Sequence, residues 1–260
     1  MTVPRLLTIA GSDSGGGAGI QADLKAFAAA GAHGASAIVA LTAQNTVGVS
    51  AVYELPADFI VAQLEAVFSD IGVDAAKTGM LFSRRVVDVV ADYLAEHLVP
   101  LVVDPVLVAS SGSKLLQDAA VQALVSRLFP LATVVTPNLA EARVLCDDSS
   151  QATRRELAER LVELGAAAAI VTGGHGDPVD HLFDGREHVE IAVERLDVAA
   201  THGAGCTHSA ALAALLARGF PLVEAARGAA GAATDAVRHG LTELGRGDGP
   251  VDVLNLKGRP

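Results

Sequence analysis

The chain is poor in cysteine, since only Cys146 and Cys206 occur among its 260 residues. Two cysteines are too few for the disulfide framework that holds small secreted domains together. The first residues run straight into an apolar segment and show no pattern of a signal peptide. We therefore expect a protein of a reducing compartment, located in the cytoplasm.

Long apolar runs and an excess of positive charge are also missing. Although 51% of the residues are hydrophobic, no run approaches the roughly 18 apolar residues that a membrane helix needs. The formal net charge is −11, whereas a nucleic-acid-binding surface requires a basic patch. We expect neither a membrane nor a nucleic acid as a partner. A phosphate-bearing ligand is compatible with this charge, because it needs only local compensation.

No Gly-Lys dipeptide occurs in the chain. A Walker A loop needs Gly-Lys followed by Ser or Thr, so the P-loop class is excluded. Gly17, Gly19 and Ala22 can be fitted to a dinucleotide-binding fingerprint, but Gln44 stands where that motif needs an acidic residue. A hydride-transferring enzyme is therefore a weak alternative.

Short apolar segments alternate with longer helical patterns along the chain. This alternation predicts a mostly parallel sheet with helices on both faces, a three-layer α/β/α sandwich. The strands are apolar throughout, as is typical of strands buried on both faces. We expect one domain over residues 1–260 with a loose tail from about Gly240. The expected strands are 5–10, 35–43, 74–77, 101–103, 133–135, 168–171, 179–183 and 188–192, and the expected helices are 20–30, 56–69, 83–97, 116–129, 138–145, 151–164, 206–217 and 222–239.

A glycine-rich start precedes an alanine- and leucine-rich helix between Thr201 and Gly219. Its first residues are Gly203, Ala204, Gly205 and Cys206. The first amide groups of a helix lack internal acceptors, and the helix dipole adds partial positive charge there. Because glycine lets a ligand approach the backbone closely, the pattern favours an anion site. Taken alone, it also fits a glycine turn before a core helix.

Polar residues follow the predicted strands at the points where they end. In open α/β sheets, ligands bind at the carboxyl ends of the strands. The segments in question are 11–19, 44–45, 77–80, 104–105 and 136–138.

These segments belong to motifs that resemble the hydroxymethylpyrimidine/phosphomethylpyrimidine kinases of thiamine biosynthesis, within the ribokinase-like superfamily. The resemblance runs from about Leu6 to about Arg238. Cys206 stands where the superfamily normally carries Asp, and Cys there is typical of the pyrimidine kinases and of some pyridoxal kinases. The motifs are Thr-Ile-Ala-Gly-Ser-Asp (8–13), Gly-Gly-Ala-Gly-Ile-Gln-Ala-Asp-Leu-Lys (16–25), Ala-Leu-Thr-Ala-Gln-Asn-Thr (40–46), Lys-Thr-Gly-Met (77–80), Val-Asp-Pro-Val (103–106), Val-Thr-Pro-Asn-Leu-Ala-Glu (135–141) and Thr-His-Gly-Ala-Gly-Cys-Thr (201–207).

The resemblance implies an enzyme that uses ATP and Mg²⁺. It would phosphorylate 4-amino-5-hydroxymethyl-2-methylpyrimidine and then its monophosphate, and it would act as a homodimer. Two alternatives stay open. One is a pyridoxal kinase of the same superfamily, and the other is a pyrimidine-binding protein with weak or no kinase activity.

The resemblance also implies roles for individual residues. Gln44 can donate and accept through one amide, which matches the amine and ring nitrogen of an aminopyrimidine. Cys206 acts either as a base or only as part of the loop shape, and Lys77 is either a phosphate neighbour or an ion-pair partner. The implied sets are Gly203, Ala204, Gly205 and Cys206 for catalysis; Gln44, Asp23, Met80, Val106 and Gly11 for the pyrimidine; Asn138, Thr172, Thr207 and Lys77 for ATP; and Asp104 and Glu141 for magnesium.

The chain departs from the family pattern at three places. Thr172 and Ala230 stand where the family usually has lysines that lie toward the nucleotide, and Asp248 stands where it usually has histidine. Losing two lysines removes local positive charge from an already acidic protein. The substrate assignment is therefore better supported than a high turnover rate.

Overall fold

A mostly parallel sheet forms the middle layer of the molecule in the computed structural model, which describes residues 2–108, 117–174 and 177–258. In these residues the sheet has nine strands in the order β3-β2-β1-β4-β5-β6-β7-β8-β9. Pairing is parallel from β2 to β7, and antiparallel at both edges, where β3 joins β2 and where β8 and β9 follow β7. The strands are β1 Arg5–Asp13, β2 His33–Asn45, β3 Gly48–Glu54, β4 Ala75–Thr78, β5 Leu101–Val103, β6 Val134–Val135, β7 Ala169–Val171, β8 Val179–Phe183 and β9 His188–Ala192.

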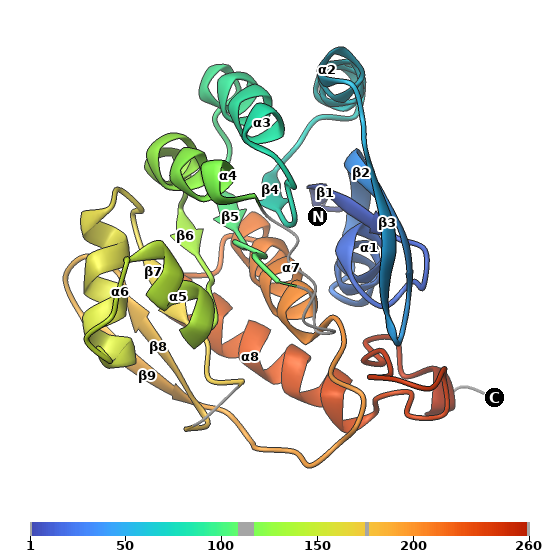
Figure 1. Cartoon of the computed structure of the whole chain (residues 1–260), viewed down its shortest axis with the longest axis vertical. Coiled ribbons are helices and arrows are strands. Elements are labelled where there is room, and N and C mark those ends of the chain that lie inside the picture. The colour runs from blue at the N-terminus through green and yellow to red at the C-terminus, as the bar shows by residue number, and fades with distance from the viewer. Residues whose placement is uncertain (1, 109–116, 175–176, 259–260) are drawn as a thin grey trace.

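Helices cover both faces of this sheet (Figure 1). One face carries α2 to α6, and the other carries α1, α7 and α8. No described helix is long and apolar enough to cross a bilayer. The π-helical turns Val67–Ile71 and Leu124–Leu128 follow α2 and α4 directly. The α-helices are α1 Gly19–Ala29, α2 Ala57–Ala66, α3 Arg84–Glu96, α4 Asp118–Ala123, α5 Leu139–Leu145, α6 Arg154–Glu163, α7 Ala204–Ala217 and α8 Leu222–Arg238.

Each strand of the middle of the sheet supplies apolar side chains to two separate cores. On β1, Leu7 and Ile9 pack under the α2–α6 layer, whereas Leu6 packs under the α1, α7 and α8 layer. On β5, Val103 and Val102 divide in the same way. Because successive strand residues point to opposite faces, a strand covered on both sides is apolar on both faces, apart from buried polar residues such as Thr8 and Lys77. The predicted three-layer α/β/α architecture is confirmed.

The β3 strand is absent from the elements expected from the sequence. Residues 48–54 pair antiparallel with β2 after a short turn, and the two strands form the β2–β3 ribbon. Leu41 lies opposite Tyr53 across this ribbon. Both Leu41 and Tyr53 are exposed, so one face of the ribbon is uncovered. The expected helix over 116–129 is shorter, running as α4 and a π-helical turn, and its first residue lies outside the described part.

The segment after Gly240 is held against the rest of the domain, contrary to the expected loose tail. Leu241 and Val251 are buried. The Gly247 amide donates to Thr46 Oγ1 at 3.2 Å. Asp248, at the third departure from the family pattern, accepts from the Thr201 amide at 2.8 Å. The segment therefore packs beside the start of α7.

Candidate active site

The glycine-rich loop after β1 is folded around the carboxylate of Asp13. Asp13 accepts hydrogen bonds from the amides of Gly15 at 2.7 Å, Gly17 at 3.1 Å and Ala18 at 2.9 Å. These three amides are satisfied within the protein and are not free to bind a phosphate. Sequence reasoning missed this role of Asp13, although an Asp directly before small residues often accepts bonds from the next amides in this way.

A second glycine loop, at the start of α7, packs directly on the first. Gly203 has a φ of 86°, in the left-handed region. A Cβ at Gly203 would lie 1.9 Å from the carbonyl oxygen of Gly17. Only glycine combines this backbone conformation with so close an approach. The contact brings the start of α7 to the carboxyl end of β1.

Free backbone amides lie at this helix start. The Ala204 amide donates to the Thr201 carbonyl at 3.0 Å. Among the described residues, the amides of Gly203, Gly205 and Cys206 have no backbone acceptor. Gly205 is exposed, and no atom lies within 4 Å of the place where its Cβ would be. The expected anion loop is therefore open at Gly205 and Cys206, whereas Ala204 is occupied.

Asp23 and Lys77 form a buried ion pair below this loop. Lys77 Nζ lies 3.0 Å from Asp23 and 3.4 Å from Asp104. Thr8 also donates to Asp23, at 2.6 Å. Both Asp23 and Lys77 are fully buried. Of the two readings of Lys77, the ion pair is the one seen, and the contacts of Asp23 with the pyrimidine and of Lys77 with ATP stay predictions.

Cys206 lies beside this ion pair. Burial raises the pKa of the Cys206 thiol to about 12, although the positive charge of Lys77 opposes the shift. Burial alone would lower the pKa of Lys77, but the negative charges of Asp23 and Asp104 raise it instead. At neutral pH the site therefore holds a neutral thiol next to a charged ammonium.

Asp104, the second carboxylate near Lys77, lies close to another buried carboxyl group, that of Glu141. Ser209 of α7 donates to Asp104 at 2.8 Å, which ties the helix to the end of β5. Glu141 accepts from the amides of Asn138 at 3.0 Å and Leu107 at 3.3 Å. Burial, and then the charge of Asp104, raise the pKa of Glu141 to about 8. A cation near both groups would relieve this unfavourable charge.

Asn138 and Thr172 are neighbours at the ends of β6 and β7. A bridge joins them, and the Thr172 amide donates to the Pro137 carbonyl at 2.9 Å. The Asn138 side chain is engaged in capping α5, where it accepts from the Glu141 amide. Thr207 is fully buried and its amide donates to the Gly203 carbonyl. Its side chain is therefore closed off from solvent in this structure, and its contact with ATP stays a prediction.

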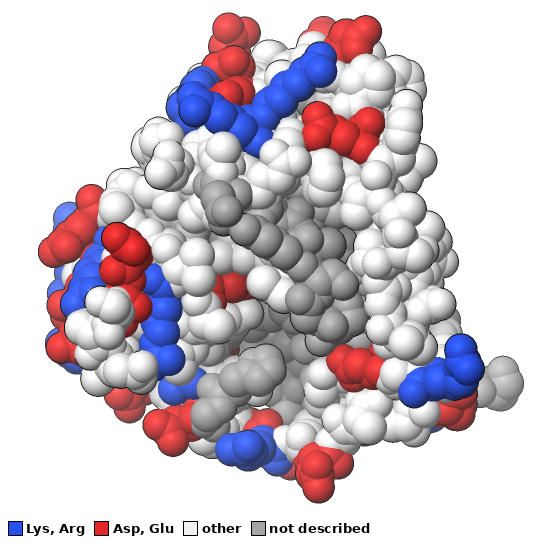
Figure 2. Space-filling model, in the orientation of Figure 1, with Lys and Arg blue, Asp and Glu red and all other residues white. Residues whose placement is uncertain are grey.

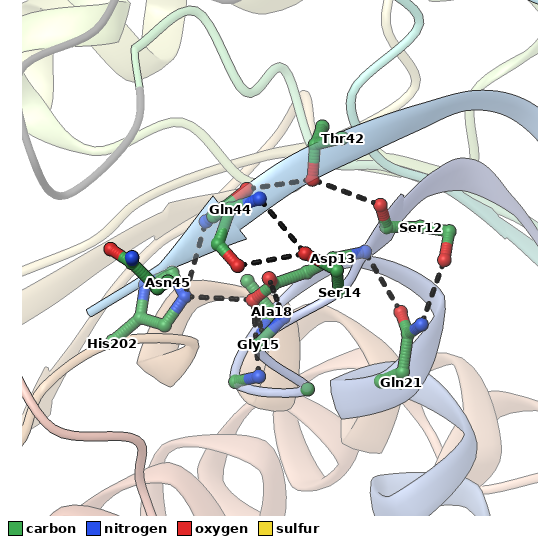
Figure 3. A network of polar contacts seen from close by, with 12 residues as sticks. Ser12, Asp13, Ser14, Gly15, Ala18, Gln21, Thr42, Gln44, Asn45 and His202 are labelled. Atoms are coloured by element: carbon green, nitrogen blue, oxygen red, sulfur yellow. Dashed lines mark hydrogen bonds and ion pairs between the residues drawn. The ribbon is translucent and has the colours of Figure 1, made fainter. Parts of the chain in front are cut away.

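Gln44 belongs to a polar network that links the end of β2 to the loop after β1 and to the start of α7 (Figure 3). Its side-chain oxygen lies 3.1 Å from Thr42 Oγ1, and its side-chain nitrogen lies 3.4 Å from His202 Nε2. His202 Nε2 also lies 3.0 Å from Asp13 Oδ2. Since His202 directly precedes Gly203, the network joins the predicted pyrimidine-binding residue to the anion loop. Neither Thr42 nor His202 was predicted to have a site role of its own.

The remaining predicted substrate residues lie at the ends of β1, β4 and β5. The Gly11 amide donates to the Met80 carbonyl at 3.1 Å. A Cβ at Gly11 would lie 2.5 Å from Met80 Cε, so the thioether packs over the glycine. Val106 is half-buried and packs on the same core as Met80. The structure thus brings Gly11 and Met80 together, and an apolar wall there fits their composition.

Positive side chains are scarce near the middle of this face. In Figure 2 the visible Lys and Arg side chains lie around the rim, and the described part of the central hollow shows none. Ala230 of α8 is 4% exposed and lines a cavity of ≈ 410 Å³ between α8 and β9. The basic residues that line this cavity are Arg227 and Arg238.

The fold and the site together define an α/β protein with open backbone amides at a helix start, at the carboxyl edge of a parallel sheet. The family model described as phosphomethylpyrimidine kinase matches residues 13–252. The chain belongs to this family. The resemblance noted in the sequence is confirmed.

Relatives agree with the family over most of the chain. The hydroxymethylpyrimidine/phosphomethylpyrimidine kinase of Rhizobium meliloti is 48% identical, over 94% of this chain and 95% of that protein. The thiamine biosynthesis bifunctional protein ThiED of Geobacter sulfurreducens is 49% identical over 96% of this chain. The chain spans only 52% of that bifunctional protein.

A solved structure is similar over the whole fold. An ADP complex of Bacillus subtilis pyridoxal kinase superposes with a TM-score of 0.90, at 38% identity, over 99% of this chain and 100% of that one. The fold therefore occurs with pyridoxal kinase activity as well as with pyrimidine kinase activity.

Proposed function

We propose that this protein transfers the γ-phosphoryl group of ATP to 4-amino-5-hydroxymethyl-2-methylpyrimidine and then to its monophosphate, a step of thiamine biosynthesis. The observation that carries the proposal is the contact of Gln44 with His202. It places a side chain suited to an aminopyrimidine against the residue that begins the anion loop. A pyrimidine bound at Gln44 would present its hydroxymethyl group toward the free amides of α7.

The protein's own groups would act mainly by positioning. The transition state of phosphoryl transfer is loose, so catalysis rests on alignment and charge stabilisation. The Gly205 and Cys206 amides would bind the oxygens of the transferring group. The Lys77 ammonium would add positive potential from its buried position, without contacting the nucleotide. Cys206, a neutral thiol at pH 7, would fill the space between Lys77 and the substrate.

Asp104 and Glu141 fit a site for Mg²⁺. Mg²⁺ is usually held by one or two carboxylates together with waters and phosphate oxygens. No group of three or more potential ligands occurs among the described residues, so waters and phosphate oxygens would supply the other ligands. A magnesium ion would neutralise charge on the phosphates. The raised pKa of Glu141 beside Asp104 supports this placement.

Product analysis by mass spectrometry tests the proposed reaction. The full chain is incubated with ATP and magnesium, and with either the hydroxymethylpyrimidine or pyridoxal. We expect the pyrimidine monophosphate and then the diphosphate to form, with a higher kcat/KM than for pyridoxal. Faster phosphorylation of pyridoxal would overturn the assignment. Transfer to neither alcohol, with the pyrimidine still bound, would favour a binding protein.

Pyridoxal kinase activity is the second candidate. The fold similarity to the Bacillus subtilis enzyme, with a TM-score of 0.90, is the observation in its favour. Pyridoxal carries a phenolic oxygen on its ring, whereas the pyrimidine carries an amine. The same kinetic comparison separates the two candidates.

We also propose a homodimer, formed through the β2–β3 ribbon. Leu41 and Tyr53 are cross-strand partners, 45% and 66% exposed, and Ala43 and Ala51 beside them are exposed as well. The four side chains share one face of the ribbon, because residues directly opposite one another point the same way and the alternate positions follow them. A second copy of the chain would cover this apolar face.

The two thiols support the expected cytoplasmic location. Cys146 and Cys206 are both free. Burial raises the pKa of Cys146 to about 11, so both thiols are protonated at neutral pH. Free thiols suit a reducing compartment.

A further inference from the structure

Hydrogen positions around Gln44 are constrained by its neighbours. Asp13 Oδ2 accepts from the Gly17 and Ala18 amides and lies 3.0 Å from His202 Nε2. Burial would raise the pKa of Asp13, but hydrogen bonds from His202, Gly15 and Ala18 outweigh it and lower the pKa. The carboxylate is therefore ionised and can only accept. The proton of His202 must then lie on Nε2.

With that proton in place, the contact between Gln44 and His202 is a mismatch. The Gln44 side-chain nitrogen is 3.4 Å from His202 Nε2, so two N–H groups face each other. A half-turn of the amide about its last bond exchanges its nitrogen and oxygen and moves no other group. The Gln44 oxygen then faces the His202 N–H.

The hydroxyl of Thr42 independently favours the same half-turn. Thr42 Oγ1 lies 3.0 Å from the Ser12 carbonyl and 3.1 Å from the Gln44 amide. A hydroxyl has one proton, so it cannot donate to two oxygens. When it donates to Ser12, its lone pairs can accept from the Gln44 nitrogen. After the half-turn, all three groups are satisfied. Thr42 and His202 are both 8% exposed, so water competes little for these positions.

A fixed amide discriminates between ligands that a rotating amide accepts equally. An aminopyrimidine presents a donor amine beside an acceptor ring nitrogen. The oxo analogue of the same ring presents an acceptor oxygen beside a donor ring N–H. A free glutamine matches either edge by turning over, whereas a held glutamine matches only one.

We propose that Thr42 and His202 hold the Gln44 amide with its nitrogen on Thr42 and its oxygen toward His202, so that the site selects a ring carrying an amine over the same ring carrying an oxo group. Thr42 and His202 are thus positioning residues that determine specificity through Gln44. The inference deepens the proposed function and rests on it. It also places the amine edge of the bound ring nearer His202 and the ring nitrogen nearer Thr42.

Binding of two analogues to the full chain tests the proposal without turnover. Calorimetry gives the Kd of 4-amino-5-hydroxymethyl-2-methylpyrimidine and of its 4-oxo analogue in the absence of ATP. We expect the original protein to prefer the amine by about 30-fold or more, since mispaired buried hydrogen-bonding groups are costly. In Thr42→Val, which keeps the side-chain shape, we expect this ratio to fall about tenfold. Thr42→Ser keeps the hydroxyl and should restore the ratio.

A matched control removes a different hydroxyl on the same ribbon. Ser50 Oγ donates to the Ala43 carbonyl at 3.0 Å and does not contact Gln44. Ser50→Ala should leave the ratio of the two affinities unchanged. If Thr42→Val lowers both affinities equally, or changes neither, the proposal is wrong.

The free protein gives a second, direct measurement. Nuclear Overhauser contacts of the Gln44 side-chain NH₂, assigned with Gln44→Glu, should connect it to Thr42 protons. If the NH₂ group contacted the His202 ring protons instead of the Thr42 protons, the proposal would be overturned. This measurement does not depend on whether Thr42→Val folds. If neither pyrimidine bound, the proposed function would fail, while the NH₂ contacts would still report the amide orientation.

Discussion

Cys206 illustrates how the environment of a residue restricts its chemistry. Burial raises the pKa of its thiol to about 12. Because a base must be deprotonated, only about one thiol in 10⁵ is a thiolate at pH 7, from the definition of pKa. If that thiolate were the base in catalysis, kcat would rise about tenfold for each pH unit from neutral pH toward that pKa.

We predict that the thiol mainly shapes the loop. Cys206→Ala should lower kcat by about 10–1000-fold, the contribution of one proton-transfer group or less. Cys206→Asp should retain activity, because related kinases carry Asp there and Lys77 would stabilise its charge. Steady-state kcat across neutral and alkaline pH, on variants with unchanged circular dichroism, measures both effects. A steep rise with pH in the original protein, lost in Cys206→Ala, would show that the thiolate is essential.

Gln44 should matter for the pyrimidine and not for ATP. We expect Gln44→Ala to weaken pyrimidine binding by about 1–3 kcal/mol, because it leaves buried polar partners without a match. ATP affinity should stay almost unchanged. Titration calorimetry with each ligand separately checks this. Equal losses for both ligands would mean that Gln44 only supports the fold.

Side-chain direction explains which site residues could be predicted. The motifs locate strand ends, so the segments around Gln44, Asp104 and Glu141 could be placed from sequence. They do not say that Lys77 turns inward to meet Asp23, because that ion pair joins residues 54 positions apart. The role of His202 depends on Asp13, which is 189 positions away.

At the scale of elements, the two glycines that begin α7 have different tasks. Gly203 has a positive φ and lies against Gly17, whereas Gly205 faces open space. Gly203→Ala should lower the free energy of unfolding by about 2 kcal/mol or more, from backbone strain and the clash. Gly205→Ala should leave stability unchanged or higher and should lower kcat/KM, because a methyl group would obstruct a phosphate. Urea unfolding and kinetics on the same samples separate the two. Full activity in Gly205→Ala would exclude close phosphate contact there.

The turn after β7 offers a gain-of-function prediction. Thr172 is half-buried beside Asn138 and stands where the family usually carries lysine. Thr172→Lys should raise kcat or lower the KM for ATP, because it adds positive charge to a region with little. Thr172→Met, of similar length without the charge, is the control. No gain from lysine over methionine would mean that Thr172 points away from the nucleotide.

The elements themselves were predicted unevenly, for a physical reason. β5, β8 and β9 were predicted with the observed bounds, because β5 is an apolar run that ends at Asp104-Pro105 and because β8 and β9 flank the turn Asp184-Gly185. β3 was missed, because this edge strand pairs only with β2 and has one exposed face. Its sequence is Gly-Val-Ser-Ala-Val-Tyr-Glu. Such a strand depends on its partner more than on its own apolar content.

At the scale of the whole molecule, two segments from opposite ends of the chain close around the start of α7. The loop after β1 contacts Gly203 through Gly17, and His202 forms a bridge with Pro250 of the last segment. The site is therefore assembled from residues at both ends of the chain. This arrangement explains why the segment after Gly240 is held in place despite its glycine-rich composition.

The exposed face of the β2–β3 ribbon yields the last prediction. A stable interface buries about 800 Å² per partner and usually has an apolar centre. Leu41 and Tyr53 would form that centre. We expect sedimentation velocity to give a dimer for the original protein and a monomer for Tyr53→Lys, with unchanged circular dichroism, because a charge buried at the interface has no partner. Leu98→Lys is the matched control, since Leu98 is 76% exposed but lies outside the ribbon, and it should leave the dimer intact. A monomeric original protein at micromolar concentration, or a dimer that persists in Tyr53→Lys, would rule out this interface.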